Sequence, residues 1–274
     1  MIYKLKITCL LLLFSGSVAW AARVDTVNVR SNSMAKDVKT VVISPQNTVK
    51  NIRYPVIYLL HGFSGNYSDW IKKDPELNRF ADEDHVIIVC PDGNFGSWYL
   101  DSPENSQWKY ETFLVTELVG WMDTHYATIA NRTGRAITGL SMGGFGALHS
   151  AIDHTEVYGA AGSMSGGVDL RPFAKSFGID MILGKYTEHP DRWEKNSIIN
   201  MLSVLKPNVL ALTLTCGHED FFHQINDELD AKLWEQKIPH DYAVRPGSHT
   251  WEYWIDSLKY QMVFFSQFFN GRKV

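Results

Sequence analysis

Hydrophobic residues are arranged in two different patterns along this chain, and these patterns predict which segments are strands and which are helices. Short runs of consecutive apolar residues are typical of strands buried on both faces, as in a parallel sheet. Such runs occur at residues 55–60, 86–90, 136–138, 158–164, 209–216 and 242–245. Apolar residues that recur every three or four positions, as on one face of a helix, occur at 77–84, 112–126, 225–234 and 251–269.

The order of these segments predicts an α/β fold. Strands and helices alternate from residue 56 to the end of the chain, which favours a mostly parallel central sheet with helices on both faces. Residues 26–32 and 39–44 alternate apolar with polar positions, so we expect an N-terminal antiparallel hairpin at one sheet edge. Residues 165–208 have no clear period and are rich in turn residues. We expect them to form an insertion over the top of the sheet, hence a candidate lid.

Composition limits the classes of partner. A chain of 274 residues with 45% apolar content favours one large domain, over residues 22–274, rather than two small ones. A net charge of -4 without a basic block argues against nucleic acid as a partner. Beyond the N-terminal segment the chain has two cysteines, Cys90 and Cys216. We expect both to be unpaired, because two cysteines do not make a disulfide scaffold.

Residues 1–21 have the three parts of a secretory signal peptide. Lys4 and Lys6 give a positively charged start, residues 7–14 are the apolar centre, and Ala-Trp-Ala at 19–21 fits the small-x-small cleavage pattern. The apolar stretch is too short to span a bilayer comfortably, and a retained anchor is the alternative. We therefore expect a secreted or periplasmic protein with no stable membrane insertion once the signal is removed.

The rest of the chain is organised around Gly139-Leu140-Ser141-Met142-Gly143, which lies between an apolar run and the expected start of a helix. Strand, Gly-x-Ser-x-Gly and helix are the context of a nucleophile elbow, in which the serine occupies a sharp and strained turn. Glycine is needed at both flanks because side chains there would collide with the neighbouring strand and helix. The alternative is a glycine-rich turn without chemistry. We predict that Ser141 is a nucleophile.

A serine nucleophile needs a base within hydrogen-bond reach and an acid that orients the base. In folds with this elbow the chain order is Ser, acid, His, and functional residues gather beyond the carboxyl ends of parallel strands. The acid should follow the strand at 209–216, where Glu219 and Asp220 stand. We prefer Asp220, because only one of two adjacent side chains can face the base. The base should follow the last strand, where His249 stands.

A metal site is the competing interpretation of the histidines near the acid. His218 and His223 are five positions apart, whereas the zinc-binding helix motif needs a spacing of four to put both rings on one face. We therefore predict catalysis without a metal ion or any other cofactor.

The negative charge of an acyl-transfer intermediate needs two N–H donors, which form an oxyanion hole. One donor should be the amide of Met142, directly after the nucleophile. The other should come from the loop after the strand that ends at Leu60, where His61-Gly62-Phe63 offers the Phe63 amide. The alternative for His61-Gly62 is an ordinary strand-end turn.

Taken together, these stretches resemble the esterase D-type branch of the α/β-hydrolases. That family includes feruloyl, acetylxylan and short-chain acyl esterases, S-formylglutathione hydrolases and mycolyltransferases. The stretches that carry the resemblance are His-Gly-Phe at 61–63, Pro-Asp-Gly at 91–93, Trp-Tyr at 98–99, Gly-Leu-Ser-Met-Gly-Gly at 139–144, Cys-Gly-His-Glu-Asp at 216–220 and Gly-Ser-His-Thr-Trp at 247–251. The likeness extends from about Arg30 to the C-terminus and implies the α/β-hydrolase fold.

The resemblance also implies three kinds of site residue. These are a catalytic triad, two oxyanion donors and aromatic residues at the substrate pocket. The residues in the matching places are Ser141, Asp220 and His249 (triad), Phe63 and Met142 (oxyanion donors), and Trp98, Tyr99 and Trp251 (pocket).

The sequence therefore predicts a secreted serine carboxylesterase that forms an acyl-enzyme. Its substrate would be a small-molecule or oligosaccharide ester with a short acyl, acetyl or feruloyl group, of the kind that decorates plant polysaccharides. Within enzymes, the alternatives are acyl transfer to a sugar acceptor and thioester hydrolysis like that of S-formylglutathione hydrolases. The alternative from another class is a carbohydrate-binding protein that kept the fold without turnover. The sequence does not predict the oligomeric state.

Overall fold

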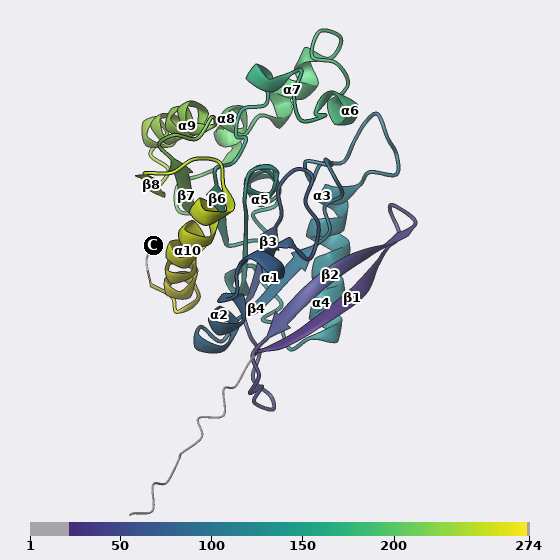
Figure 1. Ribbon diagram of the computed structural model, residues 1–274, viewed down its shortest axis with the longest axis vertical. Coiled ribbons are helices and arrows are strands. Elements are labelled where there is room, and N and C mark those ends of the chain that lie inside the picture. Colours follow the sequence, from purple (N-terminus) through teal and green to yellow (C-terminus); the bar gives the residue numbers. More distant parts are fainter. Residues whose placement is uncertain (1–21, 273–274) are drawn as a thin grey trace, which may run out of the picture.

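The computed structural model describes residues 22–272, and the predicted signal peptide at 1–21 lies outside them. Eight strands form one sheet in the order β1-β2-β4-β3-β5-β6-β7-β8 (Figure 1). Their bounds are β1 Arg23–Ser31, β2 Lys36–Ser44, β3 Val56–Leu60, β4 Ile87–Pro91, β5 Arg135–Gly139, β6 Ala160–Met164, β7 Ala211–Gly217 and β8 Asp241–Arg245. β2 pairs antiparallel with β1 and with β4, and all remaining neighbours are parallel. The predicted mostly parallel sheet with an N-terminal antiparallel hairpin is confirmed.

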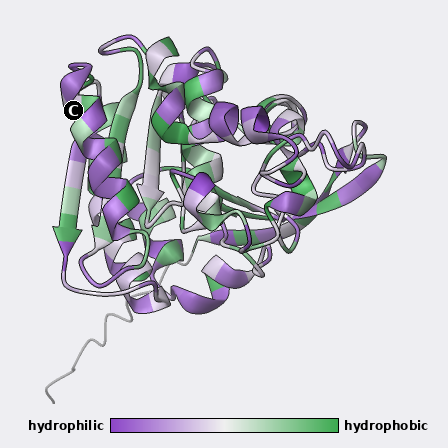
Figure 2. Ribbon diagram, turned by 90° about the horizontal axis from the view of Figure 1, so that it is seen from above, coloured by the Kyte–Doolittle hydropathy of each residue, from purple (hydrophilic) through white to green (hydrophobic). Residues whose placement is uncertain are grey.

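Helices cover both faces of this sheet, as predicted. Their bounds are α1 Asp69–Lys73, α2 Leu77–Glu83, α3 Tyr110–Thr112, α4 Val119–His125, α5 Met142–Asp153, α6 Asp180–Leu183, α7 Pro190–Asn196, α8 Ile198–Met201, α9 His223–Glu235 and α10 Trp251–Phe269. A π-helical segment, Phe113–Leu118, joins α3 to α4, so the single helix expected at 112–126 is divided into three parts. In Figure 2 the helices alternate between hydrophobic and hydrophilic colouring along their length, as amphipathic helices do.

Two hydrophobic cores, one on each face of the sheet, explain the continuous apolar runs. In β3, Val56, Tyr58 and Leu60 belong to the core that also holds residues of α5 and α9. Ile57 and Leu59, which point the other way, belong to the core that holds residues of α2 and α10. Because successive strand residues face opposite sides, all five residues of β3 are buried, and hydrophobic residues occupy both of its faces.

The segment at 165–208 is folded into the body of the protein. It contains α6, α7 and α8, which Figure 1 shows at the top of the view above α5. Trp193 and Ile198 within it are fully buried in the same core as α5. The segment therefore packs against α5, and its assignment as an insertion that moves as a lid stays a prediction.

Among the residues that the structure describes, Cys90 and Cys216 are buried free thiols. Burial raises the pKa of both, which keeps them in the unreactive thiol form. Between residues 22 and 272, no helix combines the length and apolar character needed to cross a bilayer.

Candidate active site

Ser141 occupies the sharp turn between β5 and α5. Its backbone angles, φ 53° and ψ −117°, lie in a region that L residues rarely adopt. The amide of Ser141 donates a hydrogen bond to the carbonyl oxygen of Met164 at 2.9 Å, which ties the turn to the end of β6. The predicted elbow geometry is therefore present, with the serine at the start of a helix.

The flanking glycines leave no space for a side chain. A Cβ atom on Gly139 would lie 2.7 Å from the carbonyl oxygen of Leu60, and one on Gly143 would lie 2.6 Å from the carbonyl oxygens of both Leu60 and His61. These contacts are with backbone atoms, which cannot rotate away. Glycine at these positions is thus required by the approach of α5 to the end of β3.

We expect Gly143→Ala to destabilise the protein by roughly 2–3 kcal/mol, because the added methyl group forces the elbow away from β3. For a domain of this size that change corresponds to a melting temperature lower by roughly 5–10 °C. Gly120, on an exposed part of α4, is the matched control, because a Cβ atom there would have no neighbour within 4 Å among the described residues. Gly120→Ala should raise the melting temperature slightly, since alanine is the better helix former by about 1 kcal/mol. Calorimetry that shows equal effects for both variants would contradict this account.

Three side chains from distant parts of the chain meet at the elbow. His249 lies with Nε2 2.9 Å from the Oγ atom of Ser141 and with Nδ1 2.8 Å from Oδ2 of Asp220. An ionised carboxylate can only accept hydrogen bonds, so Nδ1 carries the ring hydrogen and donates a hydrogen bond to Asp220. This tautomer leaves the lone pair of Nε2 free to accept the hydrogen of the Ser141 hydroxyl. The arrangement is that of a Ser-His-Asp triad.

Asp220, rather than its neighbour Glu219, faces the histidine. The side chain of Asp220 is fully buried, and its Oδ1 also accepts the amide hydrogen of Phe222 at 2.8 Å. The side chain of Glu219 is 58% exposed and accepts the amide hydrogen of Gly247 at 2.6 Å. That hydrogen bond lowers the pKa of Glu219 and links the loop after β7 to the loop that carries His249.

The two amides expected to bind an oxyanion lie in the segments adjoining Ser141. Met142 is the first residue of α5, so its N–H has no carbonyl partner one turn earlier in the helix. Phe63 lies in the loop after β3. That loop reaches the elbow, because a Cβ atom on Gly62 would lie 3.5 Å from the Cβ of Ser141. Within residues 22–272, the amide of Phe63 makes no backbone hydrogen bond, whereas Ser64 donates to the carbonyl oxygen of Phe95.

His61 has a positioning role that was not predicted from the sequence. Its Nδ1 donates to the carbonyl oxygen of Gly62 at 2.8 Å, and its Nε2 accepts the amide hydrogen of Gly93 at 2.7 Å. The ring therefore joins the loop after β3 to the loop after β4. Burial lowers the pKa of His61, although the hydrogen bond to Gly62 and the nearby carboxylates of Asp92 and Asp69 act in the opposite direction. The sequence analysis identified His-Gly-Phe and Pro-Asp-Gly as separate stretches. The contact between them depends on how the chain folds, so it was not predicted.

Because the folded protein keeps His61 neutral, its stability should depend on pH. The unfolded chain lets this ring protonate near its ordinary pKa of about 6.5, so below that pH the unfolded state binds more protons than the folded state. The free energy of unfolding should therefore fall as pH falls below about 6.5, by up to about 1.4 kcal/mol per pH unit, until the lowered pKa of the folded state is reached. Urea unfolding at pH 7.5 and 5.5 measures this change. His61→Gln should show a smaller fall than the wild type, and an equal fall would contradict this role for His61.

A pocket of about 530 Å³ opens beside Ser141 and His249. Aromatic residues form much of its wall. They are Phe63, Phe177, Phe221, Trp251 and Trp254. The ring of Phe221 lies 4.3 Å from the ring of His249, measured between centroids. Trp251 thus lies at the pocket, as the resemblance implies.

Trp98 and Tyr99 do not line this pocket, which corrects the expectation that they contact the substrate. Each is only 1% exposed. Trp98 packs edge-on against Phe145 and donates from Nε1 to the carbonyl oxygen of Phe177 at 3.2 Å. Tyr99 donates its hydroxyl hydrogen to the carbonyl oxygen of His61 at 3.1 Å. Both residues therefore support the pocket from behind.

Most of the aromatic wall was not predicted from the sequence. Phe177 comes from the segment at 165–208, and both it and Gly178 have left-handed backbone angles, which turn the chain sharply at this point. Its ring lies 5.9 Å from that of Phe63 and 6.0 Å from that of Phe221, measured between centroids. No motif marks Phe177, since its position depends on how the insertion packs.

The amino-acid sequence matches a known protein family over most of its length. The sequence profile of a family described as "Putative esterase" matches residues 31–265. The chain belongs to this family. The predicted resemblance to esterase D-type α/β-hydrolases is therefore confirmed, and membership supports carboxylic ester hydrolysis as the general activity.

Individual proteins and solved structures are similar to this chain over most of its length. An acetyl esterase of Caldicellulosiruptor saccharolyticus is 24% identical over 254 residues, which cover 83% of this chain and 92% of that protein. A diacylglycerol acyltransferase/mycolyltransferase of Mycobacterium tuberculosis is 27% identical over 272 residues, covering 84% and 77% respectively. A solved ferulic acid esterase superposes with a TM-score of 0.78 at 26% identity, covering 91% of this chain and 99% of that one.

Proposed function

We propose that this protein is a serine carboxylesterase in which Ser141, His249 and Asp220 form the catalytic triad. The observation that carries the proposal is the position of His249, which is within hydrogen-bond distance of both Ser141 and Asp220. Membership of an esterase family supports the same reaction.

In the first half of the proposed reaction, the Oγ atom of Ser141 attacks the carbonyl carbon of the ester. His249 takes the hydroxyl proton on Nε2, and Asp220 stabilises the resulting imidazolium through Nδ1. The carbonyl oxygen becomes negatively charged and accepts hydrogen bonds from the amides of Met142 and Phe63. The tetrahedral intermediate then expels the alcohol, which takes its proton from Nε2. An acyl-enzyme on Ser141 remains.

In the second half, water enters at the place that the alcohol left. His249 removes a proton from this water while its oxygen attacks the acyl carbon, and the same two amides stabilise the second oxyanion. Collapse of the intermediate returns the proton to Ser141 and releases the acid. No electrons are transferred, and the residues present supply every proton acceptor that these steps need.

The proposed substrates are esters with acetyl, other short acyl or feruloyl groups, including those on plant polysaccharides. A pocket of about 530 Å³ with walls of Phe and Trp supports a substrate with a flat ring, because aromatic side chains stack on cinnamoyl groups and on the apolar faces of sugars. Two of the similar proteins are named an acetyl esterase and a ferulic acid esterase. The signal peptide predicted at 1–21 agrees with a secreted or periplasmic enzyme that meets such substrates outside the cytoplasm.

Acyl transfer is the second candidate. One relative that covers most of the chain is named an acyltransferase and mycolyltransferase. The first half-reaction is the same in both cases, and only the acceptor differs, since a sugar hydroxyl takes the place of water. A binding protein without turnover is disfavoured by the alignment of Ser141, His249 and Asp220.

A substrate panel tests this proposal. Turnover should be measured on p-nitrophenyl acetate, methyl ferulate, acetylated xylan and S-formylglutathione, each with and without an added sugar acceptor. Hydrolysis of the oxygen esters, with free acid as the main product, is the expected result. A shift of product to the acylated sugar would favour the transferase, and faster turnover of S-formylglutathione would favour the thioesterase. No turnover of any of the four would contradict an enzymatic role.

A further inference from the structure

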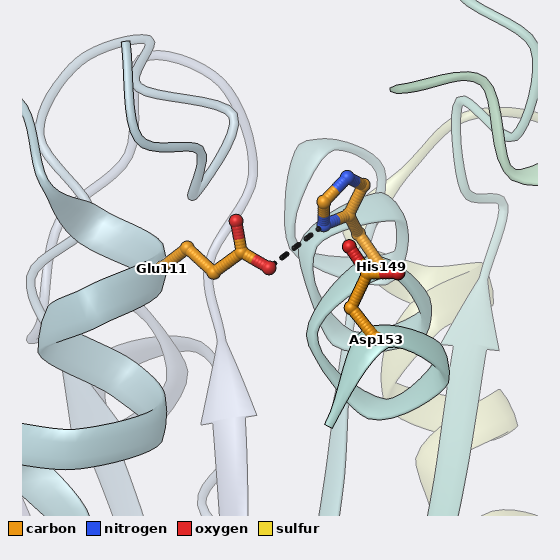
Figure 3. Close-up of side chains that lie close together, drawn as sticks. All are labelled: Glu111, His149 and Asp153. Atoms are coloured by element: carbon orange, nitrogen blue, oxygen red, sulfur yellow. Dashed lines mark ion pairs between the residues drawn. The ribbon is translucent and has the colours of Figure 1, made fainter. Parts of the chain in front are cut away.

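A second group of polar side chains lies on the far part of α5, away from the pocket. Figure 3 shows Glu111, from α3, facing His149 and Asp153, which lie four residues apart on α5. The spacing of four puts both α5 residues on the same face of the helix. One potential ligand atom from each of the three residues lies within 4.8 Å of the other two. This group is called the α3–α5 cluster below.

The α3–α5 cluster contains a buried imidazole ring, that of His149, in addition to its two carboxylates. His149 is 3% exposed, and within residues 22–272 its Nδ1 atom has no hydrogen-bond partner although it points toward Glu111. The distance from Nδ1 to Oε1 of Glu111 is 3.3 Å, which is an ion-pair distance without hydrogen-bond geometry. A buried polar atom without a hydrogen-bond partner is rare in a folded protein and calls for a physical explanation.

The other nitrogen of the ring fixes which atom is available. Nε2 of His149 lies 3.0 Å from Oδ1 of Asn196, and Nδ2 of Asn196 donates to the carbonyl oxygen of Arg192 at 2.7 Å. The carbonyl of Arg192 can only accept, so the amide of Asn196 cannot be turned around. Nε2 must therefore donate its hydrogen to Oδ1. In the neutral ring this leaves a lone pair on Nδ1, directed at a carboxylate, and that contact is repulsive unless a cation or a proton lies between.

Among residues 22–272, one further cation besides His149 contacts the cluster, the ring of His154 beside Glu111. Within the same range, the ion pairs of Glu111 are with His149 and His154 only, and Asp153 forms none. No Lys or Arg in this range neutralises either carboxylate of the cluster by direct contact.

From this geometry we propose that the α3–α5 cluster binds one divalent transition-metal cation of the zinc type, with ligands from Glu111, His149 and Asp153. Imidazole nitrogen together with carboxylate oxygen is a donor set that Zn²⁺ accepts, whereas Mg²⁺ and Ca²⁺ prefer oxygen alone. The hydrogen bond from His149 to Asn196 is the outer contact that metal-bound histidines usually make.

The size of the cluster also suits one ion. Two donors each bound at about 2.1 Å to a single ion lie at most about 4.2 Å apart. The present separations, at most 4.8 Å, therefore need only a small rotation of the Asp153 or Glu111 side chain. Asp153 is exposed, so a cation can reach the cluster from solvent. Once bound, the ion would link the C-terminal turn of α5 to α3 and stabilise the folded protein.

Titration of the full chain with Zn²⁺ tests the proposal, using calorimetry for binding and thermal unfolding for stability. We expect one tight site in the wild type and a melting temperature higher by roughly 5–10 °C when free Zn²⁺ is a hundredfold above the dissociation constant. Mg²⁺ and Ca²⁺ at the same concentration should give much smaller shifts. Addition of a chelator should reverse the effect of Zn²⁺.

Variants separate this site from adventitious binding by other histidines. Asp153→Asn, at an exposed position that tolerates substitution, should weaken Zn²⁺ binding by at least about tenfold, and Asn196→Ala by roughly 10–100-fold. Glu156→Gln is the matched control, because Glu156 is exposed, contacts His154 and lies outside the cluster. It should bind Zn²⁺ like the wild type. Equal affinity for Zn²⁺ in the wild type and Asp153→Asn would overturn the proposal. The cluster would then be an ion pair between His149 and Glu111 without a metal ion. These readouts do not use esterase activity, so they stand apart from the proposed function.

Discussion

Replacing Ser141 with alanine is expected to lower kcat for ester hydrolysis by roughly 10⁴–10⁶-fold. The reason is that the variant lacks the atom that is acylated, while the oxyanion donors and the pocket remain and supply only residual catalysis. The measurement is the initial rate on p-nitrophenyl acetate at saturating substrate. KM should change little, because Ser141 contributes little to binding the intact ester.

The matched control for this result is Ser203→Ala, the same substitution at an exposed serine far along the chain from the elbow. It should keep wild-type kcat. Thermal unfolding of both variants shows whether the fold is retained. If Ser141→Ala hydrolyses the ester at a rate within tenfold of the wild type, Ser141 is not the nucleophile.

Asp220→Asn is expected to lower kcat by about 10⁴-fold. An amide in place of the carboxylate presents an N–H group as readily as an oxygen, so the ring of His249 is no longer held with its proton on Nδ1. Nε2 then carries the proton for part of the time and cannot accept the hydrogen of Ser141. The loss of negative charge also removes the partner that stabilises the imidazolium in the transition state.

Glu219→Gln is the natural comparison, because it makes the same chemical change one residue away. Glu219 is exposed and faces Gly247 rather than His249. An amide oxygen can still accept the hydrogen of Gly247, so kcat should fall by less than about tenfold. Equal losses of kcat in the two variants, or a larger loss in Glu219→Gln, would contradict the choice of Asp220 as the acid.

The main features of the fold were predictable, because a strand that is buried on both faces is a continuous hydrophobic run in the sequence. β3 lies between two cores and is a continuous hydrophobic run, while β1, the edge strand, alternates exposed with less exposed positions. Short elements have no such hydrophobic pattern. Helix α1 has five residues, too few for a helical period, and the π-helical segment at Phe113–Leu118 differs from an α-helix by a hydrogen-bond shift that hydrophobic spacing does not encode.

The order Ser, acid, His made the candidate triad predictable, since each member follows a particular strand of a parallel sheet. The pocket was less predictable, because an aromatic residue near a motif can equally face a core. Trp98 and Tyr99 are examples, and Phe177 shows the reverse case, in which an unmarked residue reaches the pocket. The α3–α5 cluster was not predictable at all. Glu111 and His149 belong to separate helices, and only tertiary packing brings them together.

Covalent labelling tests the central claim most directly. A fluorophosphonate ester reacts with an activated serine, which displaces fluoride and forms a stable phosphonyl adduct on Oγ. Digestion and mass spectrometry of the labelled wild type should place one adduct on Ser141. Labelling of His249→Ala should be slower by roughly 10²–10⁴-fold, because the general base is missing. An adduct on a different residue with Ser141 unmodified, or labelling of His249→Ala at the wild-type rate, would contradict the account.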